Sequence, residues 1–174
     1  MRTNKRYASG TFTKRVDKDA GRHRARRNPD EPLLCEVCKA VYADRRWISK
    51  SAVSKSIDKH KDWRMAQTTV CPACQQQREG VAGGFVYIDG AFLMTHREDI
   101  ERLIHNEAER AADDNPLSRV MQTQRVGDDM LLVSTTDEHL ALQLGHALEK
   151  AFAGKVRYGF SHENKLVRVR WRRD

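Results

Sequence analysis

The 174-residue chain has no apolar run near the roughly 18 residues that a membrane-spanning helix requires. Its N-terminus is basic but lacks the apolar segment of a signal peptide. It also lacks the glycine-rich nucleotide-binding loops and the His-Glu-x-x-His pattern of metalloproteases. These absences predict a cytoplasmic protein that neither enters a membrane nor acts as an enzyme. We therefore expect no catalytic residue and no small-molecule substrate.

Cysteine is scarce, and all four cysteines lie in two Cys-x-x-Cys pairs, Cys35 with Cys38 and Cys71 with Cys74. Each pair lets one tight turn direct two thiolates at one ion, and two pairs supply the four tetrahedral sulfurs that structural zinc prefers. The alternatives are two disulfides or a thioredoxin-like redox pair. Disulfides require an oxidising compartment and the redox pair requires a βαβ setting, and the sequence indicates neither. We expect one structural Zn²⁺.

Charge divides the chain into a basic start, an acidic middle and a basic end. The overall net charge of +8 includes +7 from residues 1–30, −7 from residues 81–154 and +5 from residues 155–174. This division predicts basic surfaces that bind a polyanion, with solubility alone as the alternative. We expect a basic extended arm at 1–30, a four-cysteine zinc module with an inserted basic helix at 31–80, and an α+β domain at 81–174.

The α+β domain begins with a predicted hairpin and helix. Asp89-Gly90 is a favoured two-residue turn, and it lies between the strand-like runs 85–88 and 91–94. Thr95 and Glu98 then match a capping box at the start of a helix that runs to about Asp114.

The same pattern follows once more and ends with a third hairpin. Strands are predicted at 120–126 and 130–135, and a second capping box at Thr135 to Glu138 begins a helix that stops at Gly154. With the last strand pair, the order is ββαββαββ. We expect an antiparallel sheet, with a zinc-ribbon-like four-cysteine module before it and both helices packed against it.

The last hairpin carries the strongest signal of function after the cysteines. Apolar residues alternate with cations along both strands, so one face is apolar and the other carries five positive charges. Five like charges on neighbouring strands repel unless water or an anion separates them, and we favour a nucleic-acid backbone over a merely solvated face. The five cations are Lys155, Arg157, Arg168, Arg170 and Arg172.

Two further segments offer cations to the same polyanion. The arm has too little apolar surface to fold alone, and a helix predicted from Ser49 to about Met65 is basic around most of its surface. The alternatives are a disordered tail without a specific partner and a solvated helix face. The candidate contacts are Arg2, Lys5, Arg6, Lys14, Arg15, Arg22, Arg24, Arg26 and Arg27 in the arm, and Lys50, Lys55 and Lys59 in the helix.

Residues 35–173 resemble the archaeal and eukaryotic large-ribosomal-subunit export adaptor family, which is named for nonsense-mediated decay. The resemblance lies in an order of features: a Cys-x-x-Cys pair, an acidic helix, and then patterned strands and a second helix. The resemblance lies in four segments: Gly83–Ile88; the pattern that runs from Val126 through Ser134-Thr135 and Leu140 to Phe152; Lys155-Val156; and Leu166–Arg170.

The resemblance implies attachment to the large ribosomal subunit through contacts with rRNA and ribosomal proteins, and its metal ligands correspond to the four cysteines here. The chain departs from the family in having four cysteines instead of the usual eight. It also ends at Asp174, before the family's further β-rich domain, and lacks an export-signal tail. Nuclear export is therefore not implied.

Together these features predict a monomeric, ribosome-associated, rRNA-binding zinc protein that acts on the large subunit or the whole ribosome. Its role would be maturation, quality control or storage (hibernation). Two alternatives stay open. One is a zinc-ribbon DNA-binding regulator, although the sequence offers no helix that mixes Arg with Asn or Gln for base edges. The other is an adaptor that binds a protein partner through the acidic helices.

Overall fold

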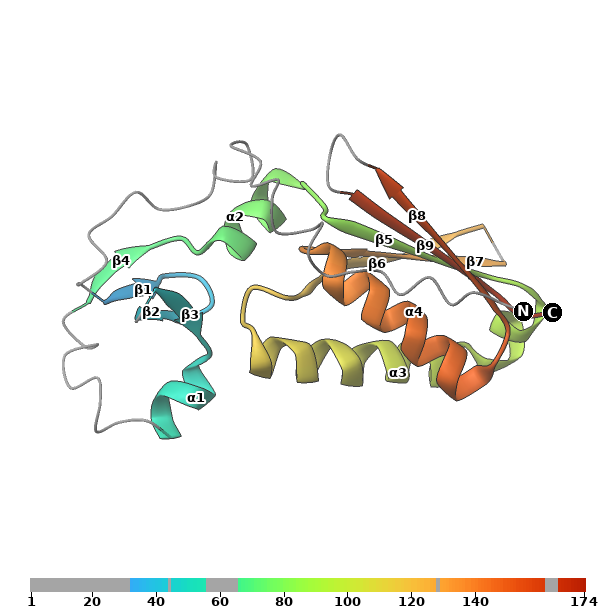
Figure 1. Ribbon diagram of the computed structural model, residues 1–174, viewed down its shortest axis with the longest axis horizontal. Coiled ribbons are helices and arrows are strands. Elements are labelled where there is room, and N and C mark those ends of the chain that lie inside the picture. The colour runs from blue at the N-terminus through green and yellow to red at the C-terminus, as the bar shows by residue number, and fades with distance from the viewer. Residues whose placement is uncertain (1–31, 44, 56–65, 128, 162–165) are drawn as a thin grey trace, which may run out of the picture.

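The computed structural model describes residues 32–43, 45–55, 66–127, 129–161 and 166–174 (Figure 1). The first half contains β1 (Leu33–Cys35), β2 (Val41–Ala43), β3 (Arg46–Ile48), α1 (Lys50–Lys55), β4 (Gln67–Thr69) and α2 (Pro72–Glu79). The second half contains β5 (Gly84–Asp89), α3 (Ala91–Asp114), β6 (Val120–Val126), β7 (Met130–Thr135), α4 (Glu138–Phe152), β8 (Lys155–Ser161) and β9 (Leu166–Arg172). Within these ranges no helix is both long and apolar enough to cross a membrane.

The first half forms a small four-stranded sheet in the order β3-β2-β1-β4. β2 pairs with β1 and β3 in antiparallel fashion. The predicted basic helix begins as α1, where the Ser49 hydroxyl accepts a hydrogen bond of 3.2 Å from the Ala52 amide. Its predicted continuation over 56–65, including Lys59, lies outside the described residues.

The second half is a five-stranded sheet in the order β6-β7-β5-β9-β8, and α3 and α4 cover one of its faces (Figure 1). The core lies between the helices and the sheet, and its largest fully buried side chains include Trp171, Ile88 and Leu144. The α+β class is therefore confirmed. The expectation of a purely antiparallel sheet is wrong, because β5 and β9 run parallel from Gly84↔Val167 to Asp89↔Arg172.

The hairpin predicted at Asp89-Gly90 does not form, and residues 91–94 are instead the first turn of α3. Gly90 precedes the helix with φ 113°, a backbone conformation that favours glycine. The backbone groups that a hairpin partner would satisfy are bonded elsewhere: the Arg173 amide donates to the Asp89 carbonyl, and the Phe92 amide donates to the Arg173 carbonyl. A short apolar run fits a strand and a buried helix turn equally well, and β7 and β9 already flank β5.

The two predicted capping boxes are also displaced. Thr95 does not begin a helix but precedes His96, where α3 kinks with φ −122° and ψ 25°. The second helix begins two residues later than a cap at Thr135 would place it, because the Asp137 carboxylate accepts a hydrogen bond from the Leu140 amide at 2.8 Å. Thr136 is buried instead, and its hydroxyl donates to the Leu117 carbonyl at 2.6 Å.

The two C-terminal hairpins are confirmed. β6 and β7 pair with the expected residue ranges, with one register shift between Val120 and Gln122. β8 and β9 pair from Lys155↔Arg172 to Ser161↔Leu166. The alternation of β9 is strict, since Val167, Val169 and Trp171 are buried while the intervening arginines are exposed. The sequence period of two therefore set which face of this hairpin points into the core.

Helix α4 packs unusually close to the sheet because it carries glycine where it crosses β9. A Cβ atom added to Gly145 would lie 2.6 Å from Cγ1 of Val169 and 3.3 Å from the Tyr158 ring. Val169 is fully buried and has no space into which to withdraw. Gly145 thus sets the distance between α4 and the strands that carry the basic face.

Replacement of Gly145 by valine should destabilise the protein by about 1–3 kcal/mol, because overpacking outweighs the better helix propensity of valine. The free energy of unfolding, measured by urea denaturation, checks this. Glu149→Val provides the control, because it introduces the same side chain at an exposed position of α4 and should change stability by about 0.5 kcal/mol at most. Equal effects of the two substitutions would contradict the proposed close packing.

Candidate metal centre

Two short local structures bring the cysteine pairs together. Cys35 is the last residue of β1, and a turn closed by the Lys39 amide on the Cys35 carbonyl at 3.0 Å carries Cys38. Cys71 and Cys74 lie at the start of α2. Parallel pairing of β1 with β4 places the two segments side by side, and the Glu36 amide extends it by donating to the Thr69 carbonyl at 2.9 Å. The expected convergence of all four cysteines is confirmed.

The four sulfur atoms have the separations of a single tetrahedral site. All lie within 4.8 Å of one another, with 3.9 Å between Sγ of Cys35 and Cys74 and 3.6 Å between Sγ of Cys38 and Cys71. Sulfurs bound at about 2.3 Å to one ion stand about 3.8 Å apart in a tetrahedron. The cysteines are free rather than disulfide-bonded, and three of them are buried. The cluster can therefore hold one metal ion, with no coordination position left open for a substrate.

Backbone amides point at the sulfurs and favour their ionised form. The amides of Cys38 and Cys71 donate to Sγ of Cys35 at 3.5 and 3.3 Å. The Cys74 amide donates to Sγ of Cys71 at 3.5 Å, so this thiol is also the N-cap of α2. The positive end of the helix thereby faces the cluster, which stabilises negative charge on sulfur.

The sequence reasoning missed Arg119, which reaches the cluster from the loop between α3 and β6. Its Nη1 donates to Sγ of Cys74 at 3.7 Å, and its Nε donates to the Pro116 carbonyl at 2.6 Å. Burial acts to lower the pKa of Arg119, but the neighbouring Cys38 thiolate raises it overall, so the guanidinium stays charged. Because Arg119 is distant in sequence from every cysteine, only its place before a predicted strand could have drawn attention to it.

The pKa values of the thiols indicate which protons a metal must displace when it binds. The hydrogen bond from Cys71 lowers the pKa of Cys38 to about 4 and correspondingly raises the pKa of Cys71. Burial raises the pKa of Cys74 to about 11. Cys71 and Cys74 are thus protonated near neutral pH when no metal is bound. Metal binding must release these protons, so the affinity for metal should rise with pH.

Arg119 is not the only residue of the second half that contacts the metal centre in the described structure. Leu117 packs against the buried cysteines, and the side-chain amide of Gln76 in α2 donates to the Thr136 carbonyl at 3.0 Å. The metal centre is therefore part of the junction between the two sheets. The polar residues 75–79 belong to helix α2.

Arg119→Gln should lower the affinity for a bound metal by about 10–100-fold, because it removes a positive charge next to the thiolates. Competition against a chromogenic chelator measures this affinity. Arg110→Gln is the matched control, since Arg110 is an exposed arginine of α3 whose only described ion pair is with Glu107. Identical affinities for the two variants would show that Arg119 does not act on the metal.

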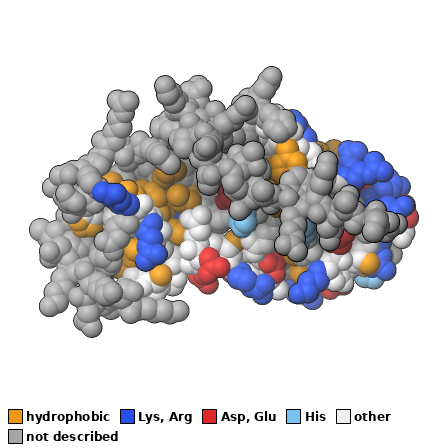
Figure 2. All heavy atoms as spheres, in the orientation of Figure 1, with side chains coloured by type: hydrophobic (Ala, Val, Ile, Leu, Met, Phe, Trp, Pro, Cys, Tyr) orange, Lys and Arg blue, Asp and Glu red, His pale blue; other side chains and the backbone are white. Residues whose placement is uncertain are grey.

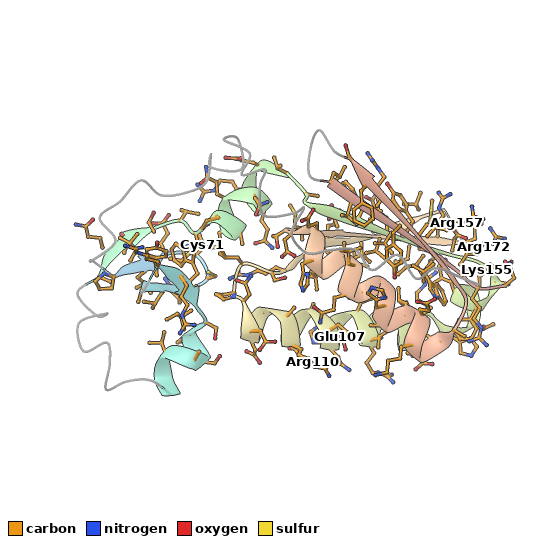
Figure 3. The ribbon with its side chains drawn as sticks, viewed as in Figure 1. Cys71, Glu107, Arg110, Lys155, Arg157 and Arg172 are labelled. Atoms are coloured by element: carbon orange, nitrogen blue, oxygen red, sulfur yellow. The ribbon has the colours of Figure 1, made fainter. Side chains whose placement is uncertain are left out.

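Register and burial place the predicted nucleic-acid contacts of the last hairpin together on the face of the sheet away from α3 and α4, and Figure 3 labels Lys155, Arg157 and Arg172 among them. We call this surface of Lys155, Arg157, Arg168, Arg170 and Arg172 the cationic strip. Asp89 lies beside it on β5 and forms ion pairs of 3.3 Å with Arg172 and 3.7 Å with Arg170. Figure 2 shows Lys and Arg side chains gathered at the same end of the molecule.

The other predicted contacts are not brought to this strip by the described structure. Lys50 is exposed at the start of α1, next to the four-stranded sheet, and Lys55 ends that helix. The arm contacts from Arg2 to Arg27, together with Lys59, lie outside the described residues.

Comparison of the chain with protein-family models, with curated proteins and with solved structures finds no match in any of the three. The resemblance to the large-subunit export adaptor family therefore stays a prediction.

Proposed function

We propose that this chain is a zinc-stabilised RNA-binding protein that associates with the large ribosomal subunit or the whole ribosome. The observation that carries this proposal is the cationic strip. It lies on regular, paired strands rather than on a loop, so the pairing fixes the backbone positions of its residues relative to one another.

The strip holds like charges against one another. Register places Lys155 opposite Arg172 and Arg157 opposite Arg170, arrangements that destabilise a sheet in the absence of a compensating anion. Asp89 compensates part of the charge of Arg170 and Arg172. Among the described residues no carboxylate forms an ion pair with Lys155, Arg157 or Arg168. A polyanion would supply the missing compensation and release its own counterions.

Contacts made by the helices weaken the two alternatives. Several carboxylates of α3 are already paired within the helix, as Asp99 is with Arg102 and Glu107 with Arg110, which weakens the case for an acidic docking surface. Two of the three glutamines of α2 are already bonded, Gln75 to Glu79 and Gln76 to the Thr136 carbonyl, which leaves fewer amides to read base edges in a DNA groove.

The basic arm adds ten Lys or Arg that can follow an rRNA backbone. We propose that the protein acts in maturation, quality control or storage, as a cytoplasmic monomer without enzymatic activity.

We further propose that the metal is zinc. Four thiolates in a closed tetrahedral site suit Zn²⁺, which has no redox chemistry to damage its ligands. The hydrophobic cluster around the cysteines contains few large side chains, since its buried members beside the cysteines are Ala40 and Ala73. A bound ion would therefore supply folding free energy that this small core does not.

Protein purified without added metal should contain one zinc per chain by elemental analysis, and Cys71→Ser should lose it. Chelation should reduce the ordered structure of the small sheet and α2, read as faster amide exchange there, while the five-stranded sheet keeps its protection. Val37→Ser is the control within the same cysteine pair, because Val37 is 56% exposed and supplies no ligand. A metal-free protein with unchanged amide protection would refute a structural zinc.

Tagged protein should co-sediment with the large subunit or the ribosome in a sucrose gradient and move to the top after RNase treatment. Replacing Arg157 and Arg168 by glutamine should release it at lower salt, because phosphate contacts set the salt dependence of binding. Arg102→Gln with Lys150→Gln on the helix layer removes equal charge and should leave sedimentation unchanged.

Protein that stays at the top of the gradient at low salt would refute ribosome association. Preferential competition by duplex DNA over rRNA would favour the regulator instead. Co-sedimentation that resists RNase would favour a protein adaptor.

A further inference from the structure

The centre of the sheet's open face carries aromatic rings next to the cationic strip. Val86 and Ile88 of β5 are fully buried under the helices, so Phe85 and Tyr87 point to the opposite face. Their ring centroids are 6.4 Å apart with planes tilted by 42°. Both side chains are only partly buried, so each ring leaves some of its surface to solvent.

Register places an arginine beside each ring. Phe85 pairs with Arg168 and Tyr87 pairs with Arg170 on the parallel neighbour β9. The guanidinium of Arg170 lies 5.7 Å from the centroid of the Tyr87 ring, and its side chain is 62% exposed. An aromatic ring and a cation are therefore available within one strand spacing of each other at two successive positions.

The remaining strands complete a graded surface. On the other side of β5, the open face of β7 carries Leu132 opposite Tyr87 and Ser134 opposite Phe85. Beyond it, the edge strand β6 presents the exposed amides Gln124 and Gln122 opposite those residues. Across the sheet, the open face thus runs from cations through aromatic rings to Leu132 and Ser134 and then to hydrogen-bonding amides.

We infer that this open face binds single-stranded RNA, with bases stacked on Phe85 and Tyr87 and phosphates held by the cationic strip. The inference rests on the proposed RNA-binding function and names the form of RNA that the site takes. Charge complementarity selects a polyanion, and the aromatic rings select one whose bases are unpaired. Base stacking requires only a π face, so the site should tolerate many sequences, with the glutamine amides adding modest preference.

A duplex would meet this surface differently. Its bases are already stacked on one another and turned inward, so a duplex would contact the cations through phosphates and leave the rings unused. Binding to the rings should therefore appear as a preference for single strands. Binding to the cations should appear as salt dependence for both forms.

The experiment uses the full-length, zinc-loaded chain and two labelled probes, a mixed-sequence RNA of about 12 nucleotides and the duplex of the same sequence. Fluorescence anisotropy over a range of salt concentrations gives affinity and salt slope for each probe. Phe85→Leu and Tyr87→Leu remove one ring each while keeping an apolar strand residue. Phe160→Leu is the matched control, because Phe160 is 52% exposed and lies on the opposite face, paired with the buried Val167.

Each ring variant should weaken single-strand binding by about tenfold or more, because stacking of one base is lost. Duplex binding should stay within about twofold, because its phosphate contacts are unchanged. Phe160→Leu should bind both probes like the unaltered protein, and Tyr87→Phe should retain single-strand binding. Thermal unfolding of every variant shows whether it is folded, and the Tyr87→Phe variant tests the ring requirement independently of the leucine variants.

Unchanged single-strand affinity in folded ring variants would overturn the inference while leaving the proposed function intact, if the protein still co-sediments with ribosomes. Equal affinity of the unaltered protein for the two probes would overturn it in the same way. A dimer in sedimentation velocity that Tyr87→Leu dissociates would assign the face to a second copy of the chain. Absence of binding to either RNA, together with absence from ribosomal fractions, would refute the proposed function as well.

Discussion

Four sulfur atoms that must share one small volume constrain the whole first half of this protein. The cysteines come from the end of β1, the turn after it and the start of α2, so one cluster fixes three local structures at once. Arg119 and Leu117 join the cluster from the loop between α3 and β6. A residue of the second half thereby places a positive charge beside the sulfurs, so the cysteine cluster contacts both halves of the chain.

β9 performs two tasks that the sheet geometry keeps apart. Its inward residues Val167, Val169 and Trp171 are in the centre of the core, while its outward residues carry three of the five charges of the cationic strip. Because one strand supplies both, the packing of the core fixes the backbone positions of the arginines. The parallel pairing of β5 with β9 brings segments about eighty residues apart into register, which places the rings of β5 next to the arginines of β9.

The sequence predicts the local features well and the non-local ones poorly. The cysteine cluster, β6 with β7, and β8 with β9 follow from spacing, turn residues and period-two alternation. The hairpin at Asp89-Gly90 fails because a four-residue apolar run does not reveal whether a strand or a helix follows, and the outcome depends on β9 occupying the neighbouring place in the sheet. The start of α2 could have been predicted, because proline directly after Cys71 is typical of the first residue of a helix. Nothing local marks Arg119, whose role depends on the tertiary fold.

The position of Lys155 and Arg157 on β8 has a consequence for self-association. β8 is an outer strand, so one row of its backbone N–H and C=O groups faces away from the sheet. Such an edge invites pairing with the edge of another molecule, and charged side chains along it oppose that approach. In the absence of a polyanion, the same cations therefore keep β8 from acting as a template for intermolecular β-sheet, and a bound polyanion would take over that protection by covering the strip.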